Sequence, residues 1–170
     1  MEKLDIHIVG LGNLGSAFLK GLNILDNVNL FLYDDSDVVR KSINDELSII
    51  PENSLTSIKN GVLILCIKPQ NINNFFENNK NKISQDVLIC SPVAGLEINI
   101  IESFMDNKII RIMPNLLIRD NKGFIPYVSN YDGDYFNFNE NVLAKLGIVK
   151  HFDEEMFPLI TALSGSGPAW

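Results

Sequence analysis

The 170-residue sequence contains few of the residues that build metal sites and disulfide frameworks: it has two cysteines, two histidines and one tryptophan. Two isolated cysteines make no metal-ligand pattern. Cys66 and Cys90 each end an apolar run, so we interpret both as small hydrophobic residues of buried strands. His7 and His151 have no second ligand at a useful spacing, and we expect both to be structural. No metal site is therefore expected.

Long apolar runs and excess positive charge are also lacking. No run reaches the roughly 18 apolar residues of a membrane span, and the N-terminus lacks the apolar core of a signal peptide. We therefore expect a cytoplasmic protein with no membrane partner. The 14 basic against 21 acidic residues give a net charge of −7, which argues against a nucleic-acid partner. Any anionic ligand would have to be held by local N–H groups rather than by a global positive field.

Apolar runs alternate with helix-like stretches along the whole chain, and 46% of the residues are hydrophobic. Strands are expected at 4–9, 28–33, 49–50, 61–67, 87–90, 108–113, 123–129 and 148–152. Helices are expected at 16–22, 36–47, 56–60, 72–80, 98–105, 135–146 and 157–163. This alternation predicts an α/β fold of the Rossmann type, with a doubly wound, mostly parallel sheet. Two asparagine-rich stretches, 71–74 and 78–81, are interpreted as surface helix and loop without chemistry.

The first thirty residues carry the most specific motif. The strand at 4–9 runs into Gly10-x-Gly12-x-x-Gly15, a helix and a second strand follow, and Asp34 stands about twenty residues after the last glycine. Gly10 permits the sharp turn, Gly12 lets a pyrophosphate approach the backbone, and Gly15 lets the helix pack on the sheet. The free N–H groups at the start of that helix attract phosphate. Asp34 is expected to accept hydrogen bonds from the adenosine ribose.

Ligands of such sheets bind outside the carboxyl ends of the strands. The loops expected at that edge are 10–15, 34–35, 68–69, 91–95 and 113–115.

Several short motifs, taken in order, resemble those of the pyrroline-5-carboxylate reductase family in its N-terminal dinucleotide-binding domain. The matching segments are Gly10-Leu11-Gly12-Asn13-Leu14 with Ala17, Asn53, Cys66-Ile67-Lys68-Pro69-Gln70, Ser91 with Ala94-Gly95, Arg111-Ile112-Met113-Pro114-Asn115, Gly123, and Leu163 to Ala169. The last of these, Leu-Ser-Gly-Ser-Gly-Pro-Ala, is the most specific.

The resemblance implies an NAD(P)H cofactor, with residues 9–14 on the pyrophosphate, Asn53 near the adenosine, and two loops beside the nicotinamide. With the two acids of the second strand added, the candidate cofactor-binding residues are Val9, Gly10, Leu11, Gly12, Asn13, Leu14, Asp34, Asp35, Asn53, Cys66, Ile67, Lys68, Pro69, Pro92, Val93 and Ala94. No catalytic residue is assigned. The family's reaction is hydride transfer to the C=N bond of 1-pyrroline-5-carboxylate, which gives proline and needs no metal.

The sequence departs from the family pattern at three places. Many members prefer NADPH, whereas Asp34-Asp35 would repel a 2′-phosphate and favour NADH. The family's Asn-Thr-Pro is replaced by Asn115-Leu116-Leu117, beside the expected nicotinamide site. The helical C-terminal domain, which in the family forms the dimer and the substrate pocket, is absent from these 170 residues.

We therefore expect residues 1–152 to form the NAD(P)-binding domain and residues 153–170 to begin a connector to the helical domain. The expected function is that of a pyrroline-5-carboxylate reductase, acting on a small-molecule substrate in proline biosynthesis and inactive without the helical domain, with which it forms a homo-oligomer. Two alternatives remain open. One is a non-catalytic nucleotide-binding module derived from such a reductase, and the other is a Rossmann reductase of the β-hydroxyacid dehydrogenase type.

Overall fold

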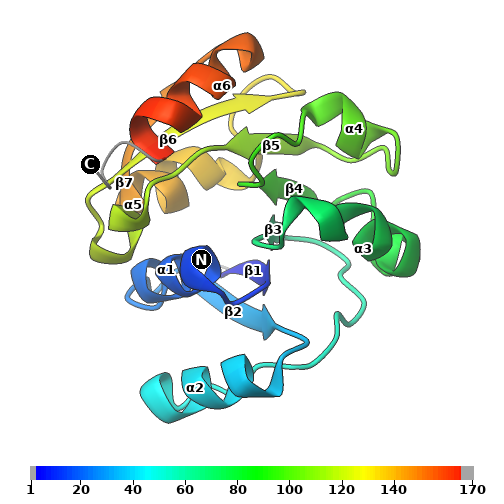
Figure 1. Cartoon of the computed structure of the whole chain (residues 1–170), viewed down its shortest axis with the longest axis vertical. Coiled ribbons are helices and arrows are strands. Elements are labelled where there is room, and N and C mark those ends of the chain that lie inside the picture. The colour runs from blue at the N-terminus through cyan, green and yellow to red at the C-terminus, as the bar shows by residue number, and fades with distance from the viewer. Residues whose placement is uncertain (1–2, 166–170) are drawn as a thin grey trace.

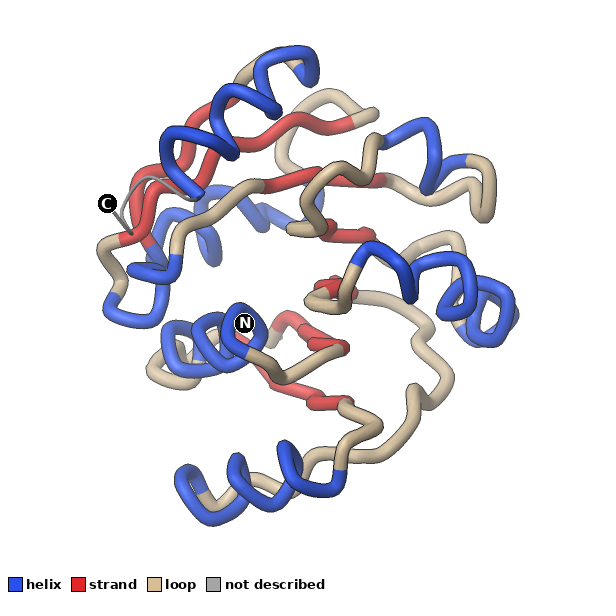
Figure 2. The backbone as a smooth tube through the Cα atoms, in the orientation of Figure 1, coloured by secondary structure: helices blue, strands red, loops and turns tan. Residues whose placement is uncertain are grey.

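The computed structural model describes residues 3–165, which form one seven-stranded sheet flanked by helices (Figures 1 and 2). The strands are β1 (Leu4–Val9), β2 (Val28–Tyr33), β3 (Val62–Leu65), β4 (Leu88–Ser91), β5 (Ile109–Ile112), β6 (Gly123–Ser129) and β7 (Gly147–His151). The α-helices are α1 (Asn13–Leu22), α2 (Asp37–Leu47), α3 (Ile72–Asn79), α4 (Ile98–Glu102), α5 (Ala144–Leu146) and α6 (Phe157–Ile160). Shorter helical turns occur at Pro69–Asn71, Lys80–Lys82, Leu116–Asp120, Tyr135–Asn137, Asn139–Leu143, Glu154–Met156 and Thr161–Gly165.

The sheet has the strand order β2-β1-β3-β4-β5-β6-β7. Every neighbouring pair is parallel except β5 and β6, which are antiparallel. β3, β4 and β5 consist entirely of buried residues, as expected for parallel strands covered on both faces. The predicted Rossmann-type, doubly wound, mostly parallel fold is confirmed.

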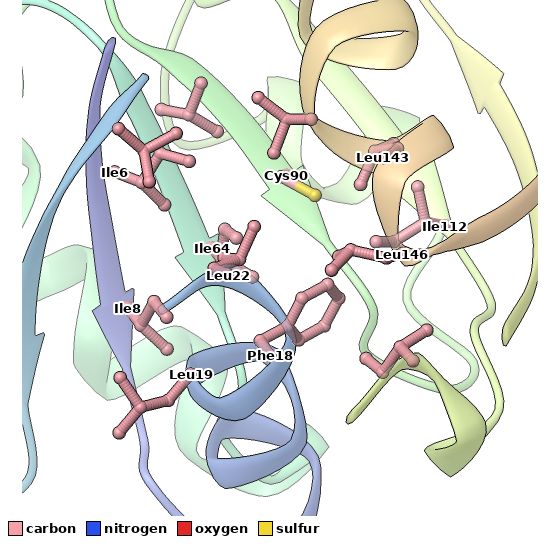
Figure 3. Close-up of a cluster of buried hydrophobic side chains, with 14 of the residues drawn as sticks. Ile6, Ile8, Phe18, Leu19, Leu22, Ile64, Cys90, Ile112, Leu143 and Leu146 are labelled. Carbon is pink, nitrogen blue, oxygen red and sulfur yellow. The ribbon is translucent and has the colours of Figure 1, made fainter. Parts of the chain in front are cut away.

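Two hydrophobic clusters cover the two faces of the sheet. On one face, Ile6, Ile8 and Ile64 pack against Phe18 and Leu22 of α1 (Figure 3), and the residues of α5 extend the same cluster. On the other face, Leu63 and Ile89 pack against residues of α3 and α4. Figure 1 shows α1 and α5 on one side of the sheet and α3 and α4 on the other. Because both faces are covered, a ligand is expected to bind at the carboxyl ends of the parallel strands.

Some predicted elements are absent or irregular. No strand forms at 49–50, because Ser48 ends α2 in the left-handed conformation (φ 55°) and directs the chain so that Ile50 is 83% exposed. Residues 56–60 form no helix; instead Ile58 bridges to Ile83. The expected helix at 135–146 is broken at Phe136, whose φ is 57°, and regular α-helix is confined to its last turn.

The segment after β7 packs back on the sheet through a partly buried ion pair. The guanidinium of Arg111, in the middle of β5, is 4% exposed and donates from Nη1 to Glu154 Oε1 at 2.7 Å. The same oxygen accepts the N–H of Ile98 at the start of α4, and the guanidinium carbon lies 4.7 Å from the ring centre of Phe157. The predicted boundary between residues 152 and 153 remains a prediction, and the Leu163–Ala169 motif lies largely outside the described residues.

His7 is a buried structural residue of β1. It is 6% exposed, stacks on Phe31 with 4.6 Å between ring centres, and shares a hydrogen bond of 3.1 Å between Nδ1 and the hydroxyl of Tyr33. Burial lowers the pKa of His7 from 6.5 to about 4, and the nearby Asp5 opposes that shift only in part. The ring is therefore neutral in the folded protein at pH 7.

Because the folded pKa of His7 is depressed, folding is favoured above the unfolded pKa of about 6.5, and that stability is lost as the pH falls toward about 4. We expect the unfolding free energy to drop by about 2 kcal/mol between pH 7 and pH 5 from this group. His7→Phe should flatten this part of the pH dependence, as measured by urea unfolding at both pH values. His151→Phe, at an exposed residue of the edge strand β7, is the matched control and should leave the slope unchanged.

Candidate functional site

A cavity of about 880 Å³ lies at the carboxyl ends of β2, β1, β3 and β4. Its lining comes from the loop after each of these strands, from the segment 53–55 and from one face of α3. The lining residues are Val9, Gly10, Gly12, Asn13, Leu14, Tyr33, Asp34, Asp35, Val39, Asn53, Ser54, Leu55, Leu65, Cys66, Ile67, Lys68, Pro69, Asn71, Asn74, Phe75, Asn78, Asn79, Pro92, Val93 and Ala94. The position is the one expected for a ligand of a doubly wound sheet.

The glycines of the first loop have three different surroundings. Gly10 has a φ of +87°, and a Cβ there would lie 2.5 Å from the carbonyl oxygen of Cys66. A Cβ on Gly15 would lie 1.9 Å from the carbonyl oxygen of Gly10, so only glycine lets α1 start this close to the end of β1. A Cβ on Gly12 would meet no atom within 4 Å. Gly10 and Gly15 therefore shape the turn, whereas Gly12 lines the cavity and leaves it open.

The start of α1 forms an anion cradle at the floor of the cavity. Its N-cap is Gly12, which supplies no side-chain cap, and the first turn contains no acidic residue. The first N–H groups of a helix lack intrahelical acceptors and lie at the positive end of the helix dipole. This ten-residue helix thus presents backbone donors to a phosphate or diphosphate.

Asp34, at the end of β2, is fixed by backbone donors on two sides. Its Oδ2 accepts the N–H of Leu11 at 2.7 Å, and its Oδ1 accepts the N–H of Ser36 at 2.9 Å. Arg40 donates from Nη1 to the carbonyl oxygen of Asp34 at 2.6 Å and from Nη2 to the carboxylate of Asp37. Each carboxylate oxygen has a second lone pair, so Asp34 can still accept a hydroxyl from a ligand in the cavity.

The structure brings the candidate cofactor residues together at this cavity. All of them line it except Leu11, which is buried and instead fixes Asp34 through its backbone N–H. The loop 113–115, which we expected to join the same edge, is not part of the cavity lining. Met113 packs against Phe157 and Ile160, and the carboxamide of Asn115 accepts the N–H of Phe124. The replacement at Leu116–Leu117 therefore lies away from the cavity walls.

Neither cysteine is activated. Cys66 lines the cavity and Cys90 lies in β4, and both are free thiols. Burial raises the pKa of each thiol well above its usual range, so both stay protonated at neutral pH and neither is a nucleophile.

Between residues 3 and 165, no group of three His, Cys, Asp or Glu residues could hold a metal ion. Over the same residues, no helix has the length and apolar character needed to cross a bilayer.

Sequence reasoning missed one wall of the cavity. Asn71, Asn74 and Asn78 of the asparagine-rich stretches line it, although we had interpreted these stretches as surface without chemistry. Their spacing of three and four residues places them on one face of a helix. Phe75 and Phe76 fix the orientation of that helix by packing on the sheet, which turns the asparagine face to the cavity. The sequence signal that could have identified this wall is the helical spacing of the asparagines next to Phe75 and Phe76.

No protein-family model matches the sequence. Among curated proteins, the chain is 26% identical to the pyrroline-5-carboxylate reductase of Methanosarcina acetivorans, an alignment that covers 100% of this chain and 66% of the relative. It is 25% identical to the corresponding reductase of Aquifex aeolicus, over 98% of this chain and 64% of the relative. The chain thus spans just under two thirds of the length of these relatives.

Solved structures agree with these matches. The pyrroline-5-carboxylate reductase of Coxiella burnetii superposes with a TM-score of 0.84 at 26% identity, covering 99% of this chain and 66% of that one. The Plasmodium falciparum enzyme, solved with NADP bound, gives 0.79 at 26% identity, over 98% and 63% of the two chains. A prephenate dehydrogenase of A. aeolicus gives 0.75 at 14% identity over 95% and 64%, which shows a shared fold alone.

Two glycine substitutions should separate folding from binding. Gly10→Ala places a Cβ against the backbone of Cys66 at a positive φ, and we expect it to destabilise the fold by about 2 kcal/mol or more. Gly12→Val should lower the unfolding free energy by only about 1 kcal/mol, because its Cβ points into open space and only the N-cap preference for glycine is lost. It should nevertheless weaken the binding of ADP-ribose by at least about ten-fold. Urea unfolding and calorimetric titration measure the two effects, and unchanged binding by Gly12→Val would contradict the cradle.

Proposed function

We propose that this chain is the cofactor-binding domain of a pyrroline-5-carboxylate reductase, and that it binds a nicotinamide dinucleotide in the cavity at the carboxyl ends of β1 to β4. One observation supports this most strongly: the motifs that resemble the reductase family, scattered between residues 10 and 94 of the sequence, converge on one cavity. The relatives named for this activity align with 100% and 98% of the chain.

The residues present fit such a cofactor. The pyrophosphate would be held by the N–H groups at the start of α1, since no side chain fills the space over Gly12. The adenosine ribose would be held by Asp34, and the nicotinamide would lie between Cys66–Pro69 and Pro92–Ala94. When bound, the cofactor supplies a hydride for a C=N bond.

The protein's own contribution at the nicotinamide end is orientation and exclusion of water. Val93 is 4% exposed, and Leu65 and Ile67 add apolar surface to the same end of the cavity. Burial keeps the thiol of Cys66 protonated, so it adds no charge beside the ring. Holding the reacting atoms in one geometry is the main requirement of a hydride transfer to an electrophilic imine.

The remaining parts of the proposal concern the whole reductase. We propose that the substrate, 1-pyrroline-5-carboxylate, binds between this domain and a helical domain that corresponds to the remaining third of the relatives, and that the helical domain makes the homo-oligomer. The free thiols of Cys66 and Cys90 suit a reducing compartment, and we assign the enzyme to the cytoplasm. We propose no nucleic-acid partner, because the net charge of −7 would repel one.

The proposal predicts binding without turnover for the 170-residue chain. Titration with NADH should give saturable binding, whereas reduction of 1-pyrroline-5-carboxylate should remain at least about 100-fold slower than in a chimera. The chimera would carry the C-terminal third of the Methanosarcina acetivorans reductase after residue 165. Turnover by the chain alone would contradict the proposed substrate pocket. Binding by a chimera that folds and dimerises but does not reduce the imine would favour the non-catalytic module.

Cofactor preference provides a separate prediction. Asp34 and Asp35 line the cavity at the expected ribose position, and a 2′-phosphate placed there would meet like charge. The nearby guanidinium of Arg40 is already paired with Asp37 and with the backbone oxygen of Asp34. We therefore propose that NADH binds more tightly than NADPH, by about ten-fold at low salt. Asp34→Ser should bring the two dissociation constants to within about three-fold of each other. Asp45→Ser, which removes a charge far along α2, is the control; equal wild-type affinities would contradict the preference.

A further inference from the structure

On the asparagine face of α3, the exposed side chains of Asn74 and Asn78 are joined by hydrogen bonds. Asn78 Nδ2 donates to the backbone oxygen of Asn74 at 2.7 Å and to its side-chain Oδ1 at 2.8 Å. Both protons of the Asn78 amide are therefore engaged within the helix. The carboxamides of Asn74 and Asn78 cannot rotate independently while this contact holds.

This pairing leaves one free acceptor and one free donor at the cavity wall. Within residues 3–165, no protein group donates to Asn78 Oδ1 and none accepts from Asn74 Nδ2. Asn79, the next residue along, is different, because its Nδ2 donates to the carbonyl oxygen of Phe75 and its Oδ1 accepts from Lys82. Asn79 is thus used by the fold, whereas Asn74 and Asn78 retain hydrogen-bonding capacity toward the cavity.

The pair lies at the end of the cavity where the adenosine is expected. The opposite wall there is the segment 53–55, and the two walls are tied together because Lys82 Nζ donates both to Leu55 O and to Asn79 Oδ1, each at 3.1 Å. Leu55 and Phe75 belong to the same hydrophobic cluster, which forms an apolar base under both walls. We expect a flat, apolar group with a polar edge to fit between them.

Adenine is such a group, and its edge matches the free amide atoms. It presents an amino donor next to a ring-nitrogen acceptor, and the carboxamide of asparagine is the side chain that complements this pattern. We propose that the Asn74–Asn78 pair reads the adenine edge of the dinucleotide, with Asn78 Oδ1 accepting from the amino group and Asn74 Nδ2 donating to the adjacent ring nitrogen. This inference rests on the proposed function and adds base specificity to it.

The test is a comparison of two dinucleotides that differ only at that edge. In the hypoxanthine analogue of NADH, an oxo group replaces the amino donor and would face the oxygen of Asn78. Each neutral hydrogen bond changes an equilibrium by roughly five-fold, and the oxo group would also place an acceptor against the acceptor oxygen of Asn78. We therefore expect the wild-type 170-residue chain to bind NADH about ten-fold more tightly than the analogue, by calorimetric or fluorescence titration.

Substitutions in α3 identify the residues responsible. Asn78→Ala should reduce the preference for adenine to within about two-fold, and Asn74→Ala should do the same, while both raise helix propensity. Asn73→Ala is the matched control, because Asn73 has the same side chain on the same helix but does not line the cavity. It should keep the wild-type preference.

A second measurement reports directly on the amide groups. In a ¹⁵N spectrum, AMP should shift the side-chain NH₂ signals of Asn74 and Asn78 and not those of Asn73, while nicotinamide mononucleotide should shift none of the three. Equal binding of NADH and its analogue by the wild-type chain would overturn the proposed recognition of adenine alone. An unchanged preference for NADH in Asn78→Ala would do the same. A wild-type chain that binds neither dinucleotide would overturn the proposed function as well.

Discussion

The close contact between the end of β1 and the start of α1 is the constraint on which the rest of the structure depends. The turn is possible only because Gly15 has no Cβ. A Cβ there would lie 1.9 Å from the carbonyl oxygen of Gly10. The same turn is held from both sides, since Gly10 N donates to Tyr33 O and Cys66 N donates to Val9 O. It therefore sets the edge at which β2, β1 and β3 end, and that edge is where the cavity forms.

The parts of this arrangement that depend on backbone geometry and buried apolar runs could be predicted from the sequence. The bounds of β1, β2 and β6 follow from apolar residues between turn residues, and the glycine spacing identifies the cradle. The strand expected at 49–50 failed because two isoleucines after a helix do not specify a partner strand, and the chain reaches β2 only at Glu52. The broken helix at 135–146 depends on the backbone of Phe136, which no propensity scale anticipates.

The side-chain lining of the cavity was predictable only where a motif carried it. Asp34 and the two loops after β3 and β4 were found through their positions next to strands, whereas the asparagines of α3 were not. Whether an exposed polar helix face borders solvent or a ligand depends on what stands opposite it. Here the opposite wall, residues 53–55, is an irregular segment fixed by a bridge from Ile58 to Ile83 and by Lys82. No local sequence pattern predicts that residues 53–55 lie near the asparagine face of α3.

The cavity combines two kinds of recognition with different consequences for specificity. Backbone N–H groups at the start of α1 can hold any diphosphate, and a chain with a net charge of −7 needs such local donors because its overall field repels anions. In the binding mode that we propose, discrimination falls to side chains at the ends of the cavity, where Asp34 and the Asn74–Asn78 pair are each held by hydrogen bonds within the protein. Because hydrogen bonds within the protein already orient these groups, less rotamer entropy would be lost when a ligand binds to them.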